Sequence, residues 1–459
     1  MDKAKKSSFK EFTRGYTFKV LLLAALVLLL LIPLGMIRSL VNERGRTAGE
    51  AESDIMEAWG RELIAAGPVI TIPGVKTEEF ITRSEKEGER AELVKTPFTL
   101  VISPKKLDIS GVFKTEVRRR GIFSVPLFSG TLTLRGSFDP APAIAGLLPG
   151  ETIAAGQAEL VIALSGQKGI RRINASSWGR DELFFQPGNK GHSLFSYGGY
   201  RRSGGGGINA ALPRLEADKE TDFAISLEIQ GGQLIRVLPV AQDTHVSIAS
   251  DWPSPSFQGA FLPNESAVGD AGFSAAWDIS YLSRDIPLFL KKYDTGEYGY
   301  DGSLFGVNFF RGIDTYALNT RAVKYAVLFL IVPFLTLFLL EIFTKHPIHP
   351  VPYLLSGIGN AVFYLLLLSL SEQIPFYAAY LAAALAVTIL LTLYSRSLLP
   401  SKNKSWYMGL VVTVSYVLLY AVLNAESYAL LIGSVGTFLI IALVMFLTRR
   451  LEWYSHEEE

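Results

Sequence analysis

Long uncharged stretches occur once near the N-terminus of this 459-residue chain and then only in its last third. Between Lys19 and Arg38 no charge interrupts residues 20–37. Each stretch is near the roughly 20 residues that a helix needs to cross a bilayer core about 30 Å thick. Hydrocarbon offers the backbone no water, so a stretch that spans it must be helical. The pattern predicts membrane helices over residues 20–37, 325–343, 353–370, 374–394, 406–423 and 427–448.

The polar insert between the first and second stretches has the composition of a soluble domain. Residues 38–66 place apolar positions at helical spacing among many charges, which predicts a helical stalk ended by Gly67-Pro68. Further on, apolar and polar residues alternate, as in strands with one buried face. We expect strands within residues 99–101, 112–118, 121–138, 159–164, 222–230, 233–240 and 244–250, with Gly231-Gly232 as a hairpin turn.

Strands at this spacing, separated by Gly and Pro, are typical of a β-sandwich. The predicted fold class is a membrane protein with a transmembrane anchor helix, a large mainly-β, sandwich-like periplasmic domain and a C-terminal bundle of five transmembrane helices. The domain takes residues 67–320 and the bundle residues 321–448. Gly-rich residues 197–207 predict a loop rather than a phosphate cradle, which would need a strand before it and a helix with Lys-Ser/Thr after it.

Basic residues beside the spans predict the orientation. The first span is preceded by six of them, opposed by Asp2 and Glu11: Lys3, Lys5, Lys6, Lys10, Arg14 and Lys19. By the positive-inside rule, residues 1–19 are cytoplasmic and the insert lies outside. The turns at 344–352 and 395–405 carry Lys or Arg. The turns at 371–373 and 424–426 each carry one Glu and no Lys or Arg. The tail, residues 449–459, is therefore expected in the cytoplasm.

Composition narrows the classes of partner and chemistry. A formal net charge of +1 and the lack of a basic run argue against nucleic acid. The chain has no Cys, so it makes no disulfides and does no thiol chemistry. A cleaved signal peptide competes with the anchor, but the first stretch ends without a small-residue cleavage site. We expect no cofactor and no metal, and the lipid bilayer as a partner.

One turn in the insert has aromatic residues at both ends. It comprises Trp252, Pro253, Pro255 and Phe257. The functional interpretation is a platform on which sugars stack, and the structural one is a turn that packs its aromatics on the sandwich. Asp251 and Asp278 also raise the possibility of a glycosidase carboxylate pair. The sequence does not bring these two acids together, and no catalytic residue is assigned.

Charges at the membrane edge are the leading functional candidates. Arg321 and Lys324 enter the second span from outside, while Glu372 and Glu426 lie beside other spans on the same side. Ionisable groups near hydrocarbon are costly, so they pair or mark a pathway. We expect an interfacial ion-pair network, with Glu341 and Lys345 pairing at the opposite edge. His346 and His349 flank a proline-rich corner that suits a stiff turn better than a metal site.

Several segments resemble the CreD family of bacterial inner-membrane proteins. They are Arg118–Ile122 (RRRGI), Trp252–Phe257 with Phe261-Leu262-Pro263, Arg321–Phe329, His349-Pro350, Phe363–Glu372, Tyr428–Leu431 and Thr448-Arg449-Arg450. The resemblance covers nearly the whole chain. In the family the proline turn carries a His between the prolines, and Ser254 stands there in this chain. That departure weakens any role for a titrating His in the turn.

The resemblance implies a role in cell envelope integrity, with family links to a carbon-source-responsive two-component regulon, the response to β-lactams and tolerance of colicins. It implies no enzymatic activity. We therefore expect a non-enzymatic periplasmic binding or scaffold module engaging envelope components or glycans. A transporter or flippase-like bundle using Glu372 and Glu426 is the alternative, and a carbohydrate-active enzyme a more remote one. The sequence does not define the oligomeric state.

Overall fold

The computed structural model describes residues 16–60, 62–84, 88–165, 167–188, 206–293, 301–309, 315–400, 402–425 and 429–449. They form two compact units. One combines residues 1–49 with 313–459 and holds the apolar helices; the other comprises residues 50–312 and holds the strands. Helix α2 (Tyr16–Trp59) contributes residues to both.

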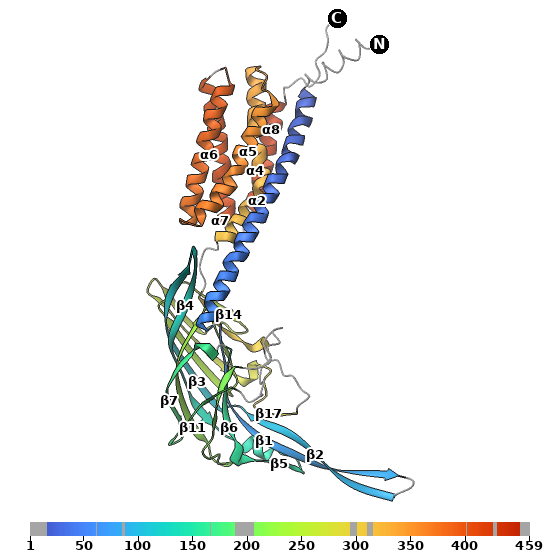
Figure 1. Ribbon diagram of the computed structural model, residues 1–459, viewed down its shortest axis with the longest axis vertical. Helices are drawn as coiled ribbons and strands as arrows, with labels where there is room; N and C mark the ends of the chain where they lie inside the picture. Colours follow the sequence, from blue (N-terminus) through green and yellow to red (C-terminus); the bar gives the residue numbers. More distant parts are fainter. Residues whose placement is uncertain are drawn as a thin grey trace. The chain divides into compact units, whose positions relative to one another are not determined.

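The helical unit contains α2 and the helices of the C-terminal third (Figure 1). Among the described residues, five helices are long and apolar enough to cross a membrane: α2, α4, α5, α6 and α7. The apolar helix α8 follows them. Proline places two of the starts, since Pro350 opens α5 behind an N-capping His349 and Pro375 precedes α6. The bounds are α4 (Thr315–Thr344), α5 (Pro350–Ser371), α6 (Phe376–Leu398), α7 (Trp406–Asn424) and α8 (Ala429–Thr448), with a 3-10 turn at Lys402–Ser405.

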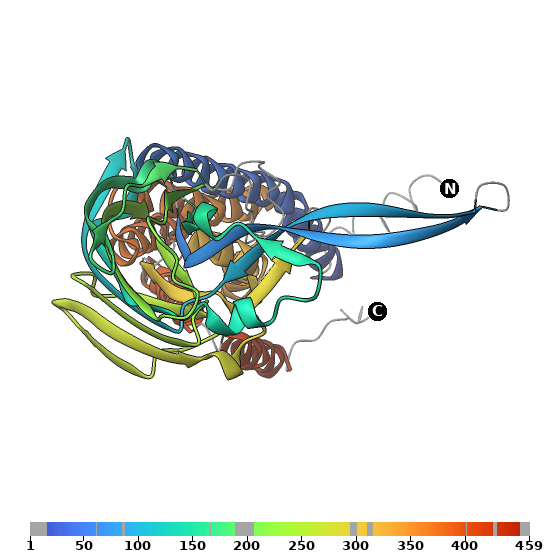
Figure 2. The same ribbon diagram turned by 90° about the horizontal axis from the view of Figure 1, so that it is seen from below.

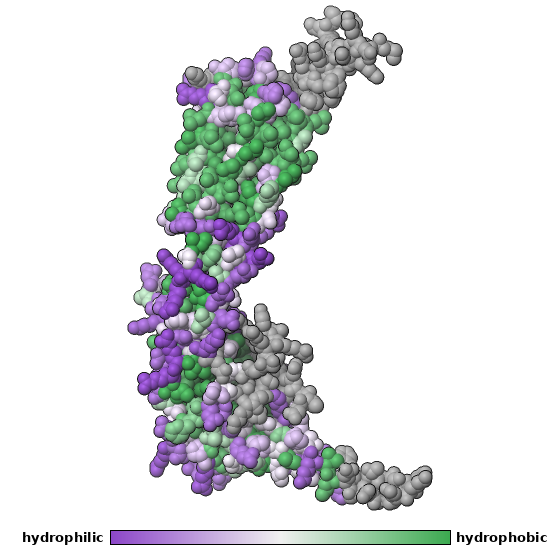
Figure 3. Space-filling view, viewed as in Figure 1, coloured by the Kyte–Doolittle hydropathy of each residue, from purple (hydrophilic) through white to green (hydrophobic). Residues whose placement is uncertain are grey.

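The outer surface of these helices is apolar between polar ends (Figure 3). Inside the unit, buried aromatic and aliphatic side chains of α4, α5, α6 and α7 form one core, which Leu30, Leu34 and Val41 of α2 join. Gly357 of α5 allows α2 to approach closely. A Cβ built there would lie 2.3 Å from Cδ1 of Leu30, so a larger residue requires the side chain of Leu30 or the helix that carries it to shift.

The β unit consists of two sheets that share one hydrophobic core. In the described residues, the larger sheet follows the order β14-β18-β12-β1-β6-β10-β9, with β2 and β5 also on β1, and β17 on β2. Its strands are β1 (Leu63–Ser84), β2 (Gly88–Ile102), β5 (Glu151–Ile153), β6 (Glu159–Leu164), β9 (Gln186–Pro187), β10 (Gly207–Ala211), β12 (Leu234–Leu238), β14 (Pro255–Gly259), β17 (Phe289–Lys292) and β18 (Phe305–Phe309).

The second sheet has the order β15-β16-β13-β3-β4-β11-β7-β8 in the described residues. Its strands are β3 (Lys106–Arg120), β4 (Phe123–Phe138), β7 (Ile170–Trp178), β8 (Asp181–Glu182), β11 (Thr221–Gly232), β13 (Asp243–Ser250), β15 (Glu265–Gly269) and β16 (Gly272–Ser280). Short helical pieces lie at Ala141–Ala145, Ala155–Gln157, Gln167–Gly169, Tyr281–Ser283 and Asp301–Ser303.

Strict alternation of burial shows why these segments are strands. Along β13 every second residue from Thr244 to Ser250 is buried, and β16 alternates in the same way around the buried Trp277. Aromatic residues from both sheets meet in the middle: Trp277 of β16 lies 5.5 Å from Phe305 of β18, measured between ring centroids. The expectation of a mainly-β sandwich is confirmed.

Strands β1 and β2 extend together well beyond the rest of their sheet (Figure 2). They pair from Ile70 and Ile102 to Ser84 and Gly88, and β5 covers β1 only at Gly74–Lys76. From Thr77 onward the described part of this pair is a two-stranded ribbon. An isolated ribbon is marginally stable in water, so its far half depends on the near half for order.

Two local expectations are wrong. The predicted stalk ends earlier than residue 66, because α2 stops at Trp59 and β1 begins at Leu63. Gly231-Gly232 is not a hairpin turn but the end of β11, after which the chain crosses to β12 in the other sheet. Close packing accounts for Gly232, where a Cβ would lie 2.7 Å from Cγ of Met56 on α2. The predicted Gly-rich loop at residues 197–207 lies almost wholly outside the described residues.

Candidate functional site

Glu372 lies at the C-terminal end of α5 and contacts two other helices. Its Oε1 accepts a hydrogen bond from the Tyr316 hydroxyl of α4 at 3.2 Å. The same oxygen is 3.7 Å from Nε of Arg44 on α2. The Glu372 side chain is 10% exposed and that of Arg44 48%. This acid therefore joins α2, α4 and α5 at one end of the helical unit.

The other predicted members of this network have different positions. Arg321 and Lys324 lie on α4, where Arg321 is partly buried and Lys324 is exposed. Glu426 lies outside the described residues. The ion pair of Glu372 is with Arg44, which the sequence reasoning assigned to the stalk. A sequence signal for Arg44 exists, since it follows the first apolar stretch by about two helical turns.

A second charged cluster occupies the opposite end of the same helices. Nζ of Lys19 on α2 donates to Oε1 of Glu341 on α4, and the Tyr353 hydroxyl of α5 donates to its Oε2 at 2.7 Å. Glu341 is buried, with its side chain 6% exposed. The expected partner was Lys345, but it follows the end of α4 and has a left-handed backbone with φ of 52°. The ion-pair partner of Glu341 is Lys19 instead.

Buried polar side chains on α5 lie between the two charged clusters along the helix. Tyr353 and Glu372 are about 28 Å apart along α5 at 1.5 Å per residue, close to the thickness of a hydrocarbon core. Between them, Asn360 donates from Nδ2 to the Phe329 carbonyl at 3.1 Å and accepts from the Tyr416 hydroxyl at 2.6 Å. Buried on the same helix are Ser356, Tyr364 and Ser371. These groups are uncharged, and charge is confined to the two ends.

The aromatic turn packs on the sandwich. Phe257 lies in β14 with its ring centroid 5.9 Å from that of Trp277 and 6.0 Å from that of Phe273. Trp252 is partly buried against the same core, and its Nε1 donates to the Ser254 carbonyl at 3.1 Å. These rings are held against the β unit by the core and by the turn itself. The arrangement supports the structural interpretation of Trp252, Pro253, Pro255 and Phe257 over a free platform for sugars.

The acids considered for glycoside hydrolysis lie at opposite ends of a strand pair. Asp251 follows β13 and accepts from the Thr115 backbone N–H at 2.8 Å and its hydroxyl at 2.7 Å. Asp278 lies opposite His245 near the start of β13, with Oδ1 2.6 Å from Nδ1 of that histidine. Six residues of strand separate the two levels, about 20 Å. That distance exceeds the carboxylate separation of either glycosidase class.

Metal-ligand groups do not gather in the described part of the chain. No cluster of three or more His, Asp or Glu residues there can hold a metal ion. His349 instead caps α5, where its Nδ1 accepts from the Val351 backbone N–H at 3.4 Å. His349 thus belongs to a helix start.

An acid that sequence reasoning missed is buried at the start of β5. Oε2 of Glu151 accepts from Nζ of Lys291 on β17 at 2.5 Å and from the Leu148 backbone N–H at 2.7 Å. These two bonds, the lysine first, lower the pKa of Glu151 below its usual value of 4.5. The Glu151 side chain is 1% exposed. The pair ties β5 to β17, which are separated by 140 residues in sequence.

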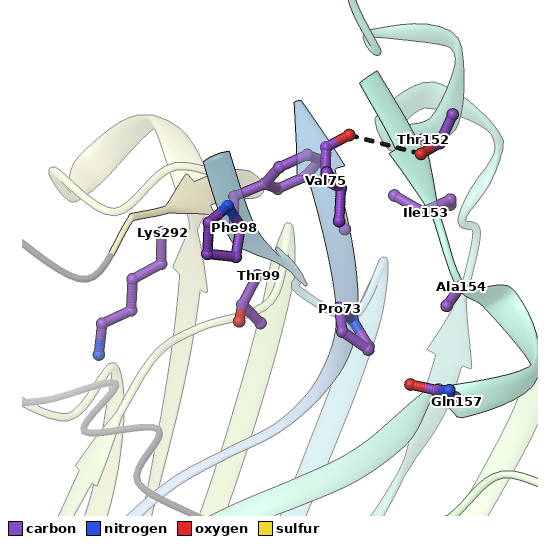
Figure 4. A pocket seen from close by; sticks show the side chains of 11 residues that line it. Pro73, Val75, Phe98, Thr99, Thr152, Ile153, Ala154, Gln157 and Lys292 are labelled. Atoms are coloured by element: carbon purple, nitrogen blue, oxygen red, sulfur yellow. Dashed lines mark hydrogen bonds between the residues drawn. The ribbon is translucent and has the colours of Figure 1, made fainter. Parts of the chain in front are cut away.

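A hollow of about 440 Å³ lies on the outer side of β1, β2 and β5, near this pair (Figure 4). Pro73, Val75 and Ile153 give it apolar walls, and Lys292 and Gln157 stand at its sides. Thr152 is held at the rim by donating to the Val75 carbonyl at 3.4 Å. The lining offers one cation and one amide but no pairing of a nucleophile with a base.

The fold and the two charged clusters define an integral membrane protein with a large two-sheet β unit inserted between its first and second membrane helices. The sequence model of the family described as "Inner membrane protein CreD" matches residues 15–454. The chain is also 31% identical over 445 residues to the Inner membrane protein CreD of Escherichia coli (strain K12), covering 95% of this chain and 94% of that protein. The chain therefore belongs to the CreD family.

Proposed function

We propose that this protein supports the integrity of the cell envelope as a non-enzymatic binding or scaffold module, with the β unit engaging an envelope component and the helices anchoring it. The observation that carries the proposal is that both acids described in the helical unit form ion pairs between helices. Glu341 and Glu372 each join α2 to the bundle, through Lys19 and Arg44 respectively. Acids committed to ion pairs between helices suit an anchor.

The end of α2 is equally well fixed in the β unit. Two guanidinium groups lie over the Trp59 ring, with Cζ of Arg118 3.9 Å and Cζ of Arg171 5.4 Å from the ring centroid. The Trp59 carbonyl accepts from Nε2 of Gln230 at 2.8 Å, and Arg120 pairs with Asp54 at 2.9 Å. Cations over an indole ring add to packing, most of all for tryptophan. These contacts fit a scaffold whose anchor helix is part of its binding unit.

Photo-crosslinking in living cells tests this function. A crosslinking amino acid would replace exposed residues of the β unit one at a time, for example Phe184, Leu262 and Leu282. We expect repeated capture of an envelope component by the β unit and loss of envelope protection when residues 50–312 are deleted. Full protection by the helices alone would contradict the proposal.

The orientation belongs to the same proposal, with both termini in the cytoplasm and the β unit in the periplasm. It is supported by the basic residues before the first span and by Arg396 in the last turn of α6. Reporter fusions at Lys6 and Glu459 should behave as cytoplasmic, and fusions within the β unit as periplasmic. Protease that reaches the β unit only from the cytoplasmic side would refute this orientation.

Transport by the bundle is the second candidate function, and the buried polar stripe of α5 favours it. The Tyr364 hydroxyl is fully buried and has no hydrogen-bond partner among the described residues. A buried polar group without a partner is costly and calls for a functional explanation. Tyr364→Phe removes only this hydroxyl, so it should then abolish envelope protection while the protein keeps its thermal stability. Loss of both together would show that the stripe only holds the helices in place.

A further inference from the structure

The outward face of the second sheet carries charged side chains in two neighbouring rows. Backbone pairing places Arg135 of β4 opposite Asp108 of β3, and Asp108 beside His245 of β13. His245 in turn lies opposite Asp278 of β16. In the next row Lys106 lies beside Asp243. All six side chains leave the sheet on the face away from the core, because their strand neighbours Leu107, Leu134, Val246, Trp277 and Ile279 are buried.

These side chains line a hollow of about 600 Å³, the charged hollow, made by Lys106, Asp108, Arg135, Asp243, His245 and Asp278. Its volume lies in the range of sites for small molecules. An adjoining hollow of about 350 Å³ continues along the same strands. Small residues such as Ser110, Ser247 and Ala276 line it, so the surface beside the charges stays open to a ligand.

Most charges of this hollow are not neutralised by one another. Within the part of the chain that the structure describes, Lys106, Asp108, Arg135 and Asp243 make no side-chain hydrogen bond or ion pair, although opposite charges are strand neighbours. The single pair is His245 with Asp278. Cross-strand neighbours of opposite charge ordinarily attract one another. Here their polar ends remain available to a ligand.

The charges are also partly sorted across the sheet. Both cations lie on the β4 and β3 side, together with Asp108, whereas Asp243 and Asp278 lie on the β13 and β16 side. Strands are about 4.8 Å apart, so the outer strands β4 and β16 are separated by about 14 Å. Side chains that lean inward shorten that span. An extended tripeptide is about 10 Å long.

We propose that the charged hollow binds a short peptide with free amino and carboxyl ends. Its carboxylate lies on the β3–β4 side against Arg135 and Lys106, and its ammonium lies on the β13–β16 side against Asp243 and Asp278. Asp108, between the two ends, accepts from the peptide backbone. Arginine suits the carboxylate because its planar fork can donate two parallel hydrogen bonds. The inference rests on the proposed role of the β unit as a binding module and names its ligand.

Calorimetric titration of the full chain in detergent with tri-alanine tests the inference. Three blocked peptides serve as probes: N-acetyl-tri-alanine, tri-alanine amide and the doubly blocked form. We expect tri-alanine to bind, each single block to weaken binding about tenfold, and the doubly blocked peptide to give no signal up to about 10 mM. Equal binding of free and doubly blocked peptides, or no binding of tri-alanine, would overturn the inference.

Two variants then locate the peptide ends. Arg135→Gln should weaken tri-alanine about tenfold and leave tri-alanine amide unaffected, because the amide has no carboxylate to lose. Asp278→Asn should do the converse, weakening peptides with a free amine and sparing the N-acetyl peptide. Arg180→Gln, an equal charge change at the exposed turn between β7 and β8 of the same sheet, should change nothing. A fall of similar size in Arg180→Gln, or equal effects on all four peptides, would show non-specific attraction.

Circular dichroism of each variant checks the fold, which we expect to be unchanged because these side chains are exposed. The crosslinking experiment separates this inference from the function on which it rests. Normal crosslinks from the β unit together with no peptide binding would reject the ligand and keep the scaffold role. Peptide binding without crosslinks or envelope protection would reject the scaffold role and keep the ligand.

Discussion

Breaking the ion pair between Lys19 and Glu341 should destabilise the helical unit strongly. The Glu341 side chain is 6% exposed and the Lys19 side chain 22%, so the pair is largely shielded from water. Removing one partner of a buried pair costs about 3–5 kcal/mol, because the other charge remains buried. The Tyr353 hydroxyl still donates to Glu341, and Lys19 is partly solvated. We therefore expect Lys19→Met to cost about 2–3 kcal/mol.

Thermal denaturation of the detergent-solubilised protein measures this loss. At about 2–4 °C per kcal/mol for a unit of this size, Lys19→Met should lower Tm by about 4–12 °C. Glu341→Gln should cost less, because a lysine at the membrane edge can extend its ammonium toward water. The double variant Lys19→Met/Glu341→Gln should be more stable than the sum of the single losses predicts, by about 1–2 kcal/mol.

Lys404→Met is the matched control, because Lys404 is exposed and lies in the short 3-10 turn before α7. It should leave Tm unchanged. Strict additivity of the Lys19 and Glu341 effects would refute the reasoning. So would a Lys19→Met variant that is as stable as Lys404→Met.

Three further outcomes are expected. Glu372→Gln should cost about 1 kcal/mol, because the partner Arg44 is about half exposed and the ion pair is correspondingly weak. Adding Arg44→Gln should recover part of this loss. Full stability of Glu372→Gln together with loss of envelope protection would favour transport instead. Gly357→Val should lower Tm sharply, while Gly35→Val, with no atom within 4 Å of its Cβ, should not. The pKa of Glu151 is lowered, so its stabilisation holds above pH 4.5 and is lost as pH falls through the lowered value. Glu151→Gln should therefore melt earlier at pH 7 and lose less on acidification; parallel acid curves for both proteins would contradict this.

Periodicity made the strands and the membrane helices predictable, because a buried face leaves a regular trace along the chain. The predicted strand at residues 159–164 coincides with β6, and each predicted span falls on a helix. Helix α4 is longer than its apolar stretch, since it begins at Thr315, before Arg321. Helical hydrogen bonding continues into the interface, where charges are tolerated and hydropathy gives no signal.

The ion pairs were not predictable from one sequence. Lys19 and Glu341 are 322 residues apart, and their contact depends on α2 packing beside α4. Sequence reasoning identified Glu372 as a candidate but paired it with Arg321 and Lys324, because the three were expected at the same surface of the membrane. The hairpin turn predicted at Gly231-Gly232 was wrong for a related reason. Two glycines indicate a turn by local chemistry, whereas here Gly232 gives Met56 of α2 room to approach.

The strand order of the larger sheet has a consequence for the synthesis of the protein. Its centre, β1, appears early in the chain, but β12 lies beside it and β18 must pair with both β12 and β14. The sheet stays incomplete until Phe309 has been made, only a few residues before α4 begins. Pairings so distant in sequence form slowly. The cell must therefore hold some 250 residues of unfinished β structure while the ribosome is already producing the next membrane helix.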